Sequence, residues 1–348
     1  MIAEKYQALM KEWDAKNELY KPSVFWAEAS KELVQEFDVF GLENFRSLSS
    51  SLLFFVPTYG RPGNGYSEEV IQRVEQVLMA SDVADKQRVA FEQFSSGYDN
   101  ALADYRVFKA VNQSGDLPNL NLFSESQIGN PIEQFEFNGQ FFSRSALNYL
   151  LGLSFLKQFS DFTEINTILE IGGGFGTLGE IVHKTMPSTQ YINVDIPPTS
   201  FASEYYLQQV VGESEVSNYE STKHQEPINI SELKRISVLN SWQIESLKGQ
   251  VDLFVNYISF QEMEPEIVQN YLKKVKDLGA KWLLLRNMRE GKQLRKNNRV
   301  GVETPILSED YINMLGGYEL VASNVMPFGY KTVDHFHSEI MLFKREDV

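Results

Sequence analysis

The chain has 348 residues, 43% of them hydrophobic and 13% aromatic, so it is long enough for two domains with sizeable cores. Acidic residues outnumber basic ones by 47 to 32, and the net charge of −15 argues against a nucleic-acid partner, which needs a basic surface. The absence of cysteine excludes disulfides, thiolate metal sites and a cysteine nucleophile, and it fits a reducing compartment. The charged N-terminus lacks a signal-peptide apolar core and no run of 18 apolar residues occurs, so we expect a cytoplasmic protein without an integral membrane segment.

Residues 1–140 are predicted to form a mainly helical domain, because apolar residues recur at helix-like spacing between positions 8 and 37. The apolar run at 52–57 is compatible with a short strand. The loop that follows is dense in turn formers and contains Tyr59 and Arg61. It is either a connector or a substrate lid, in which Arg61 meets an anionic group and Tyr59 stacks on a ring. This domain is expected to shape an acceptor pocket or to mediate pairing in a homo-oligomer.

A polar, turn-rich segment leads into the second predicted domain, residues 141–348. An amphipathic helix is expected over 143–159, packed on a sheet. From residue 166 onwards strand and helix patterns alternate, which predicts an α/β fold with a seven-stranded, mostly parallel, doubly wound sheet. The strands are expected to begin at Thr167 and to continue at Tyr191–Asp195, Arg235–Leu239, Val251–Asn256, Lys281–Arg286, Tyr318–Ser323 and His335–Phe343. The last two are too close in sequence for a crossover helix and predict an antiparallel hairpin.

The first of these strands runs into the glycine stretch on which the second domain is organised. Gly172, Gly174 and Gly176 leave room for a ligand to approach the backbone, and the following helix offers its free N–H groups. Glu170 is a carboxylate near the end of an otherwise apolar strand, where burial is costly without a partner. The hydroxyls or the amine of a bound cofactor would be such a partner, so we predict a cofactor site here.

Two cofactors compete for this site. The spacing Gly174-x-Gly176-x-x-Gly179 matches the dinucleotide pattern, and Asp195 lies about where a ribose-binding acid is expected, which would make the protein an NAD(P)-dependent oxidoreductase. Glu170 inside the first strand and an antiparallel seventh strand weigh against that reading. These features resemble the class I S-adenosylmethionine-dependent methyltransferases, whose first motif is an acidic residue followed by alternating glycines.

The resemblance extends to three stretches of the chain. Leu169–Gly176, Val194–Pro198 and Phe254–Met263 are similar to the sugar O-methyltransferases associated with bacterial surface-polysaccharide clusters, and the similarity covers roughly residues 130 to 345. It implies a Rossmann-like methyltransferase fold, S-adenosyl-L-methionine as the cofactor, and a small-molecule or glycan acceptor whose hydroxyl is methylated in polysaccharide biosynthesis.

The resemblance also implies roles for individual residues. Glu170 would bind the methionine end of the cofactor directly or through water, Asp195 would hold the ribose hydroxyls, and Asn240 or Ser241 would touch the adenine edge. The residues expected to bind the cofactor are Glu170, Gly172, Gly173, Gly174, Gly176, Asp195, Ile196, Asn240, Ser241 and Asn256.

Methyl transfer requires an aligned hydroxyl and a base that removes its proton. Ligands of an open α/β sheet lie beyond the carboxyl ends of the parallel strands, and an antiparallel last strand starts at that edge. His335 and His337 can therefore face the methyl group, although both fit ordinary structural roles equally well. Glu262, after the fourth strand, is the third candidate for a catalytic residue; it could instead orient a histidine, bind a metal or sit at a helix N-terminus.

The acceptor is expected to contact Tyr59, Arg61, Tyr257, Ser259 and Arg286. Arg286 would hold a phosphate or carboxylate of the acceptor or pair with a neighbouring acid. Glu262, Asp334 and His335 could supply oxygen and nitrogen ligands to a divalent metal ion, but they form no contiguous ligand pattern, so we expect no metal. The alternative outside the enzymes is a catalytically silent methyltransferase-like partner protein.

Overall fold

The computed structural model describes residues 2–14, 16–55, 68–81, 83–113, 117–295, 301–331 and 335–346. The strands are β1 (Gln134–Phe137), β2 (Gln140–Ser143), β3 (Thr167–Ile171), β4 (Gln190–Asp195), β5 (Val216–Ser217), β6 (Ile228–Asn229), β7 (Ile236–Asn240), β8 (Leu247–Lys248), β9 (Leu253–Tyr257), β10 (Trp282–Met288), β11 (Tyr318–Asn324), β12 (Tyr330–Lys331) and β13 (His337–Arg345). The helices are α1 (Ile2–Asp14), α2 (Val24–Phe40), α3 (Ser49–Phe54), α4 (Glu68–Ala80), α5 (Asp85–Ser95), α6 (Tyr98–Val111), α7 (Arg144–Leu156), α8 (Thr177–Thr185), α9 (Thr199–Val211), α10 (Tyr219–Thr222), α11 (Pro265–Asp277) and α12 (Ser308–Met314).

The main sheet, counted over the described residues, has nine strands in the order β11-β13-β10-β9-β3-β4-β7-β5, with β12 paired to β13 beside this order. Strand β13 is antiparallel to β10 and β11, and the other pairings along the order are parallel. The predicted mostly parallel α/β sheet and its terminal antiparallel hairpin are therefore confirmed. The two-residue strands β5 and β12 extend the seven that the sequence predicts.

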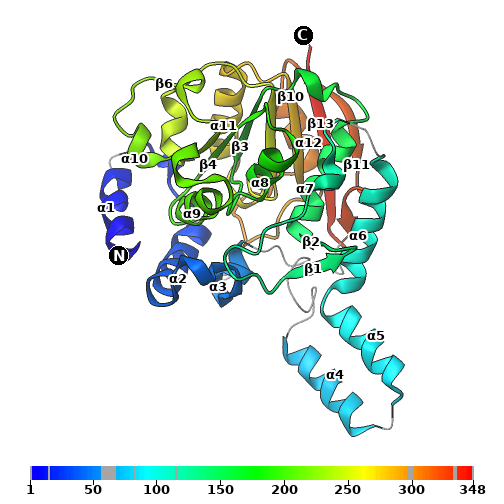
Figure 1. Cartoon of the computed structure of the whole chain (residues 1–348). Coiled ribbons are helices and arrows are strands. Elements are labelled where there is room, and N and C mark those ends of the chain that lie inside the picture. The colour runs from blue at the N-terminus through cyan, green and yellow to red at the C-terminus, as the bar shows by residue number, and fades with distance from the viewer. Residues whose placement is uncertain are drawn as a thin grey trace.

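The sheet has an apolar layer on each face, because successive side chains of a strand point to opposite sides. Along β3, Ile168 belongs to one buried cluster and Leu169 to the other. Helices α7, α8 and α9 pack into the first cluster, and α11 and α12 pack into the second. Both faces are thus covered, as parallel strands that are apolar on both sides require (Figure 1).

The N-terminal residues pack on both layers of the same body. Trp13 of α1 is fully buried, and its ring lies 5.6 Å from that of Trp242, just after β7. Leu33 and Phe37 of α2 join the cluster formed by α7 and α8. Helices α4 and α5 extend away from the sheet (Figure 1). No helix in the described part of the chain is both long and apolar enough to cross a bilayer.

The prediction of a short strand at 52–57 is wrong for residues 52–55, the part that the structure describes, because Ser49–Phe54 forms helix α3. Six apolar residues do not distinguish a strand from a short buried helix, so tertiary contacts decide. The Glu36 carboxylate accepts hydrogen bonds from the Ser50 backbone N–H at 2.9 Å and from its hydroxyl at 2.5 Å, which holds the first turn of α3. Phe55 then packs between Phe37 and Phe45.

Candidate functional site

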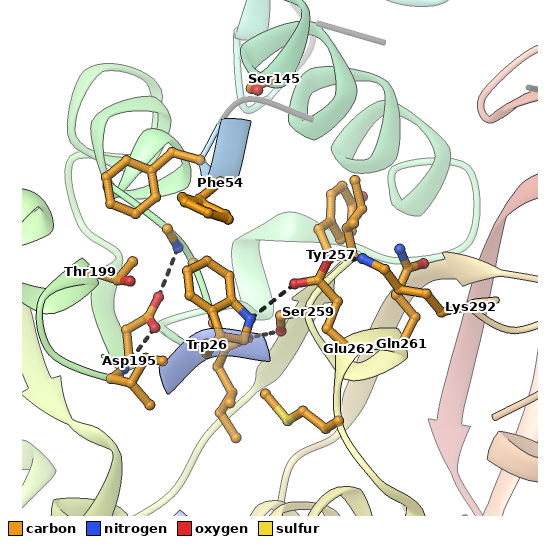
Figure 2. A pocket seen from close by; sticks show the side chains of 18 of the residues that line it. Trp26, Phe54, Ser145, Asp195, Thr199, Tyr257, Ser259, Gln261, Glu262 and Lys292 are labelled. Atoms are coloured by element: carbon orange, nitrogen blue, oxygen red, sulfur yellow. Dashed lines mark hydrogen bonds and ion pairs between the residues drawn. The ribbon is translucent and has the colours of Figure 1, made fainter. Parts of the chain in front are cut away.

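A cavity of about 820 Å³ opens at the carboxyl edge of β3, β4 and β9. The glycine turn after β3, the end of β4 and the segment after β9 form its floor, and α2, α3 and α7 contribute the opposite walls (Figure 2). Residues from both predicted domains therefore line one space. This is the position in which open α/β sheets bind their ligands.

The glycine turn adopts a conformation that side chains would obstruct. Gly172 and Gly174 have φ angles of 71° and 60°, in the left-handed region that favours glycine. A Cβ atom on Gly173 would lie 2.5 Å from Glu170 Oε2, so the turn lies directly on that carboxylate. Nothing lies within 4 Å of a Cβ built on Gly174, which leaves the turn open towards the cavity.

Asp195 ends β4 beside this turn and lines the cavity while remaining only 8% exposed. Its carboxylate oxygens accept backbone N–H groups, Oδ2 from Gly174 at 3.0 Å and Oδ1 from Ile196 at 2.7 Å. Burial raises the pKa of Asp195 to about 8, although these two hydrogen bonds oppose the rise. Each oxygen keeps a further lone pair, so the carboxylate can accept hydroxyl groups from a ligand.

Glu170 lies beneath the glycine turn, and it is not among the described residues that line the cavity. Its two oxygens accept hydrogen bonds from the hydroxyls of Tyr149, at 2.7 Å, and Tyr191, at 2.5 Å. Burial raises the pKa of Glu170 to about 7, against the two tyrosine hydrogen bonds, which lower it. The partner that the sequence requires is thus a pair of tyrosines. Any cofactor contact would pass through Tyr149, which does line the cavity.

Three side chains meet on the opposite side of the cavity. Trp26 of α2 donates its indole N–H to Glu262 Oε2 at 3.1 Å, and Lys292 forms an ion pair with Glu262 Oε1. In Figure 2 the indole lies between Asp195 and Glu262, with Phe54 beside it. The side chain of Glu262 is 15% exposed, and its carboxylate is held in one orientation by donors from two distant parts of the chain.

The predicted cofactor and substrate residues divide into two groups. Those that line the cavity are Gly172, Gly173, Gly174, Asp195, Ile196, Ser241, Tyr257 and Ser259, together with the catalytic candidate Glu262. Those that lie behind the wall, besides Glu170, are Gly176, Asn240, Asn256 and Arg286; among the described residues none of them borders the cavity.

Each residue behind the wall has a structural role that explains its position. Gly176 is the N-cap of α8, at a φ of 97°. The Asn240 side chain accepts a hydrogen bond from Ser200 Oγ at 2.8 Å, and Asn256 donates to the backbone oxygen of Ile171 at 2.9 Å. Arg286 is fully buried against Asn148 and the backbone oxygen of Phe328. These contacts account for the positions of the four residues behind the cavity wall, and their predicted ligand contacts stay predictions.

His335 and His337 do not line the cavity as the described residues define it. His335 is exposed with a φ of 72°, and the ring of His337 meets Glu290 Oε1 at 2.5 Å. The start of the last strand still lies near the ligand-binding edge of the sheet, because Lys331 of β12 pairs with His337 and lines the cavity.

Tyr59, Arg61 and Asp334 lie outside the described residues. Within the residues that are described, no three His, Asp or Glu side chains converge in a way that could hold a metal ion.

The site also contains residues that the sequence did not single out for it. Trp26 fits the apolar spacing of a core helix, and Lys292 follows β10 in a charged loop, so neither carries a local signal. Thr199 at the start of α9 lines the cavity, and its buried hydroxyl has no hydrogen-bond partner in the described structure. The polar positions of α7, including Asn148 and Tyr149, interrupt its apolar pattern and could have been recognised.

No protein-family model matches the chain, and no curated protein sequence does. Solved structures that match include methyltransferases. Mitomycin 7-O-methyltransferase MmcR is 14% identical with a TM-score of 0.42, covering 92% of this chain and 99% of its own. Magnesium protoporphyrin IX methyltransferase from Synechocystis PCC 6803, with bound S-adenosylhomocysteine, is 11% identical with a TM-score of 0.38, covering 70% and 100%. An O-methyltransferase from a polyketide multienzyme of Brevibacillus brevis is 13% identical with a TM-score of 0.39, covering 58% and 74%.

Proposed function

We propose that this protein is an S-adenosylmethionine-dependent O-methyltransferase that acts on a hydroxyl of a sugar or glycan. One observation carries the proposal. The glycine turn and Asp195 follow the adjacent parallel strands β3 and β4, and both line the cavity that Glu262 also lines. The antiparallel β13 beside β10 is the further feature by which the chain resembles class I methyltransferases rather than dinucleotide-dependent oxidoreductases.

The cofactor end of the cavity lies between the glycine turn and β4. Asp195 can accept both ribose hydroxyls, and Ile196 and Ser241 border the space next to it for an adenine ring. The open face of Gly174 leaves room for the remainder of the cofactor. Bound there, S-adenosylmethionine supplies an electrophilic methyl group, so the protein must align the acceptor oxygen and remove its proton.

Glu262 is the base in this proposal. It is the catalytic candidate that borders the cavity, and Trp26 and Lys292 fix its direction. With S-adenosylmethionine bound, the acceptor oxygen would take its methyl group as the carbon–sulfur bond breaks and S-adenosylhomocysteine leaves, and the Glu262 carboxylate would take the proton that the acceptor O–H loses. His335 and His337 are the competing candidates from the sequence.

The aromatic wall supports a sugar-like acceptor. Trp26 and Phe54, whose ring centroids are 6.1 Å apart, present apolar faces beside the Glu262 carboxylate. A ring that carries both C–H groups and hydroxyls suits this combination, because its faces can pack on aromatics while its hydroxyls donate to the carboxylate. Since α2 and α3 supply these side chains, residues 1–140 would shape the acceptor pocket in this proposal.

Calorimetry with S-adenosylhomocysteine and with NADH tests the cofactor. We expect micromolar binding of the former and none of the latter. Asp195→Asn should weaken that binding about 10-fold or more, since a hydrogen bond to a charged group contributes about 1.5–3 kcal/mol. The opposite ligand preference would favour the oxidoreductase alternative, and binding of neither would favour the catalytically silent partner.

Transfer is measured with labelled cofactor and a panel of nucleotide sugars and lipopolysaccharide fragments. Glu262→Gln should lower kcat by about 10²- to 10⁴-fold, the usual contribution of a general base, with unchanged affinity for S-adenosylhomocysteine. His335→Ala and His337→Ala are made in parallel. If either of these abolishes transfer and Glu262→Gln does not, that histidine is the base.

A further inference from the structure

The cavity face of α7 carries polar side chains away from Asp195. Ser145 and Asn148 lie one turn apart on this helix and both line the cavity. They are buried, at 8% and 3% exposed. The Ser145 hydroxyl and the Asn148 amide nitrogen have no hydrogen-bond partner in the described part of the structure. A buried donor without a partner is costly, so two on one helix face indicate a ligand group that satisfies them.

The direction of the Asn148 amide follows from its neighbour Arg286. A guanidinium only donates hydrogen bonds, so Asn148 must turn its oxygen towards Arg286, and the observed contact is to Oδ1. The amide nitrogen consequently faces away from Arg286. Asn148 therefore presents a donor whose dipole is aligned by the positive charge behind it.

Arg286 supplies a buried positive charge that forms no ion pair of its own in the described regions; the Asp104 carboxylate, which acts on it at longer range, is paired with Arg144. It is fully buried, donates to the backbone oxygen of Phe328, and lies 5.2 Å from the centre of the Tyr257 ring. No carboxylate lies within 4.0 Å of its guanidinium nitrogens in the described regions. The nearby Arg144 does not change this balance, because its Nε pairs with Asp104 at 3.1 Å. A buried cation is stable only with an opposite charge or good hydrogen bonding nearby.

The N-terminus of α7 adds positive electrostatic potential to the same wall of the cavity. The helix has 13 residues, and Ser143 caps it by accepting the Ala146 N–H at 3.0 Å. The positive end of the helix dipole therefore lies next to Ser145. Two donors without a partner among the described residues, a buried guanidinium and a helix N-terminus thus lie at one wall of the cavity, although the chain as a whole carries a net charge of −15.

We propose that this wall is an anion subsite, so that the acceptor is a sugar bearing a carboxylate or a phosphate group. The inference rests on the proposed methyltransferase function and specifies its acceptor. The anionic group accepts hydrogen bonds from Ser145 and Asn148, and Arg286 stabilises it through the Asn148 amide without touching it. The subsite orients the sugar so that one of its hydroxyls is presented to Glu262.

Calorimetry with three matched sugars tests the subsite. Glucose, glucuronate and glucose 1-phosphate are titrated into the full-length protein, with and without S-adenosylhomocysteine. We expect at least one of the two anionic sugars to bind about 10-fold or more tightly than glucose, and the difference to shrink at high salt. Preference for glucuronate identifies a carboxylate acceptor, and preference for glucose 1-phosphate identifies a phosphorylated one.

Asn148→Asp is the decisive variant. The new carboxylate pairs with Arg286, which preserves the fold, but it removes the donor and repels an anion, so the anionic sugars should lose their advantage over glucose. Ser145→Ala should weaken the same sugars, whereas Ser160→Ala, beyond the end of α7 with its hydroxyl on the Leu156 oxygen at 3.0 Å, should not.

Equal binding of charged and neutral sugars would overturn the subsite, as would an Asn148→Asp protein that keeps the preference. Either result leaves the methyltransferase proposal standing if S-adenosylhomocysteine still binds. If the unmodified protein does not bind S-adenosylhomocysteine, the methyltransferase proposal is contradicted instead. The titrations without that ligand then still decide whether the wall binds anions.

Discussion

Asp195 makes the pH dependence of the site predictable. Its folded-state pKa of about 8 is raised from the ordinary value of 3.8, chiefly by burial. Between these values the folded protein holds a proton that the unfolded chain has lost. The contribution of this group to folding stability is therefore fully present below about pH 4 and falls as the pH rises towards 8.

Cofactor affinity should change in the opposite direction, because ribose hydroxyls donate to the ionised carboxylate. We expect the affinity for S-adenosylhomocysteine to increase from pH 6 to pH 8, by at most about 10-fold per unit, and to level off above. Calorimetry in two buffers of different ionisation enthalpy should detect proton release at pH 6–7. Asp195→Asn should abolish both effects, and a flat affinity profile in the unmodified protein would contradict the role given to Asp195.

Glu170 illustrates what a motif can and cannot reveal. The sequence predicts that this buried carboxylate needs a partner, and burial is confirmed. Tyr149 and Tyr191 meet that need, and neither lies in the motif. The identity of a buried partner depends on how α7 and β4 pack, which local sequence does not determine.

Helix α7 joins the two halves of the cavity, and a single glycine allows its close approach to β9. A Cβ atom on Gly152 would lie 1.4 Å from the hydroxyl oxygen of Tyr257. The Tyr257 ring stacks on Tyr149 with centroids 4.7 Å apart, so it cannot move without displacing that residue. Gly152→Ala should therefore destabilise the protein by about 1–3 kcal/mol, although alanine is the better helix former by about 1 kcal/mol.

Urea unfolding measures this change, and a second substitution supplies the control. Tyr257→Phe removes the hydroxyl that the new methyl group would meet, so the double variant should recover much of the loss. The two single effects would then fail to add, as expected for residues in contact. Strict additivity would show that the strain lies elsewhere on the helix.

Elements with a strong period were predictable, and those decided by contacts were not. The seven strands β3, β4, β7, β9, β10, β11 and β13 and the helix α7 follow from apolar runs and spacing. The α3 segment was ambiguous, because Glu36 caps it from a different helix. Trp26 fits the apolar spacing of a buried helix, and that spacing does not reveal that its indole N–H reaches Glu262, 236 residues away.

The N-terminal region and the sheet share their apolar layers. Residues from α2, α6, α7 and α8 belong to one buried cluster, and α1 joins the other with strand residues of the sheet. Phe45 also packs against Phe175 in the glycine turn, with ring centroids 5.4 Å apart. The conformation of the glycine turn therefore depends on residues more than a hundred positions earlier in the chain.

A buried charge network fixes this junction. Arg46, 1% exposed, donates to Glu125 at 2.9 Å and to Glu133 at 2.7 Å, and its guanidinium lies 4.8 Å from the Phe175 ring centre. Arg46→Met would leave two buried carboxylates without their cation. We expect a loss of about 3–5 kcal/mol at pH 7, measured by urea unfolding. Burial already raises the pKa of Glu125, so the loss should shrink as the pH falls and the carboxylates become neutral.

Lys31→Met is the control, because Lys31 pairs with Glu28 at 2.8 Å and both side chains are exposed. An exposed pair contributes about 0–1 kcal/mol, so this variant should unfold nearly as the unmodified protein does.

The shared apolar layers lead to a further expectation for Arg46→Met. Tryptophan fluorescence, which includes Trp13 and Trp26 of the N-terminal region, and circular dichroism should report one common transition at a lower urea concentration. A fluorescence change that precedes the loss of helix and sheet signal would mean that the N-terminal region unfolds alone, and Arg46 would then stabilise a separable cap rather than the whole fold.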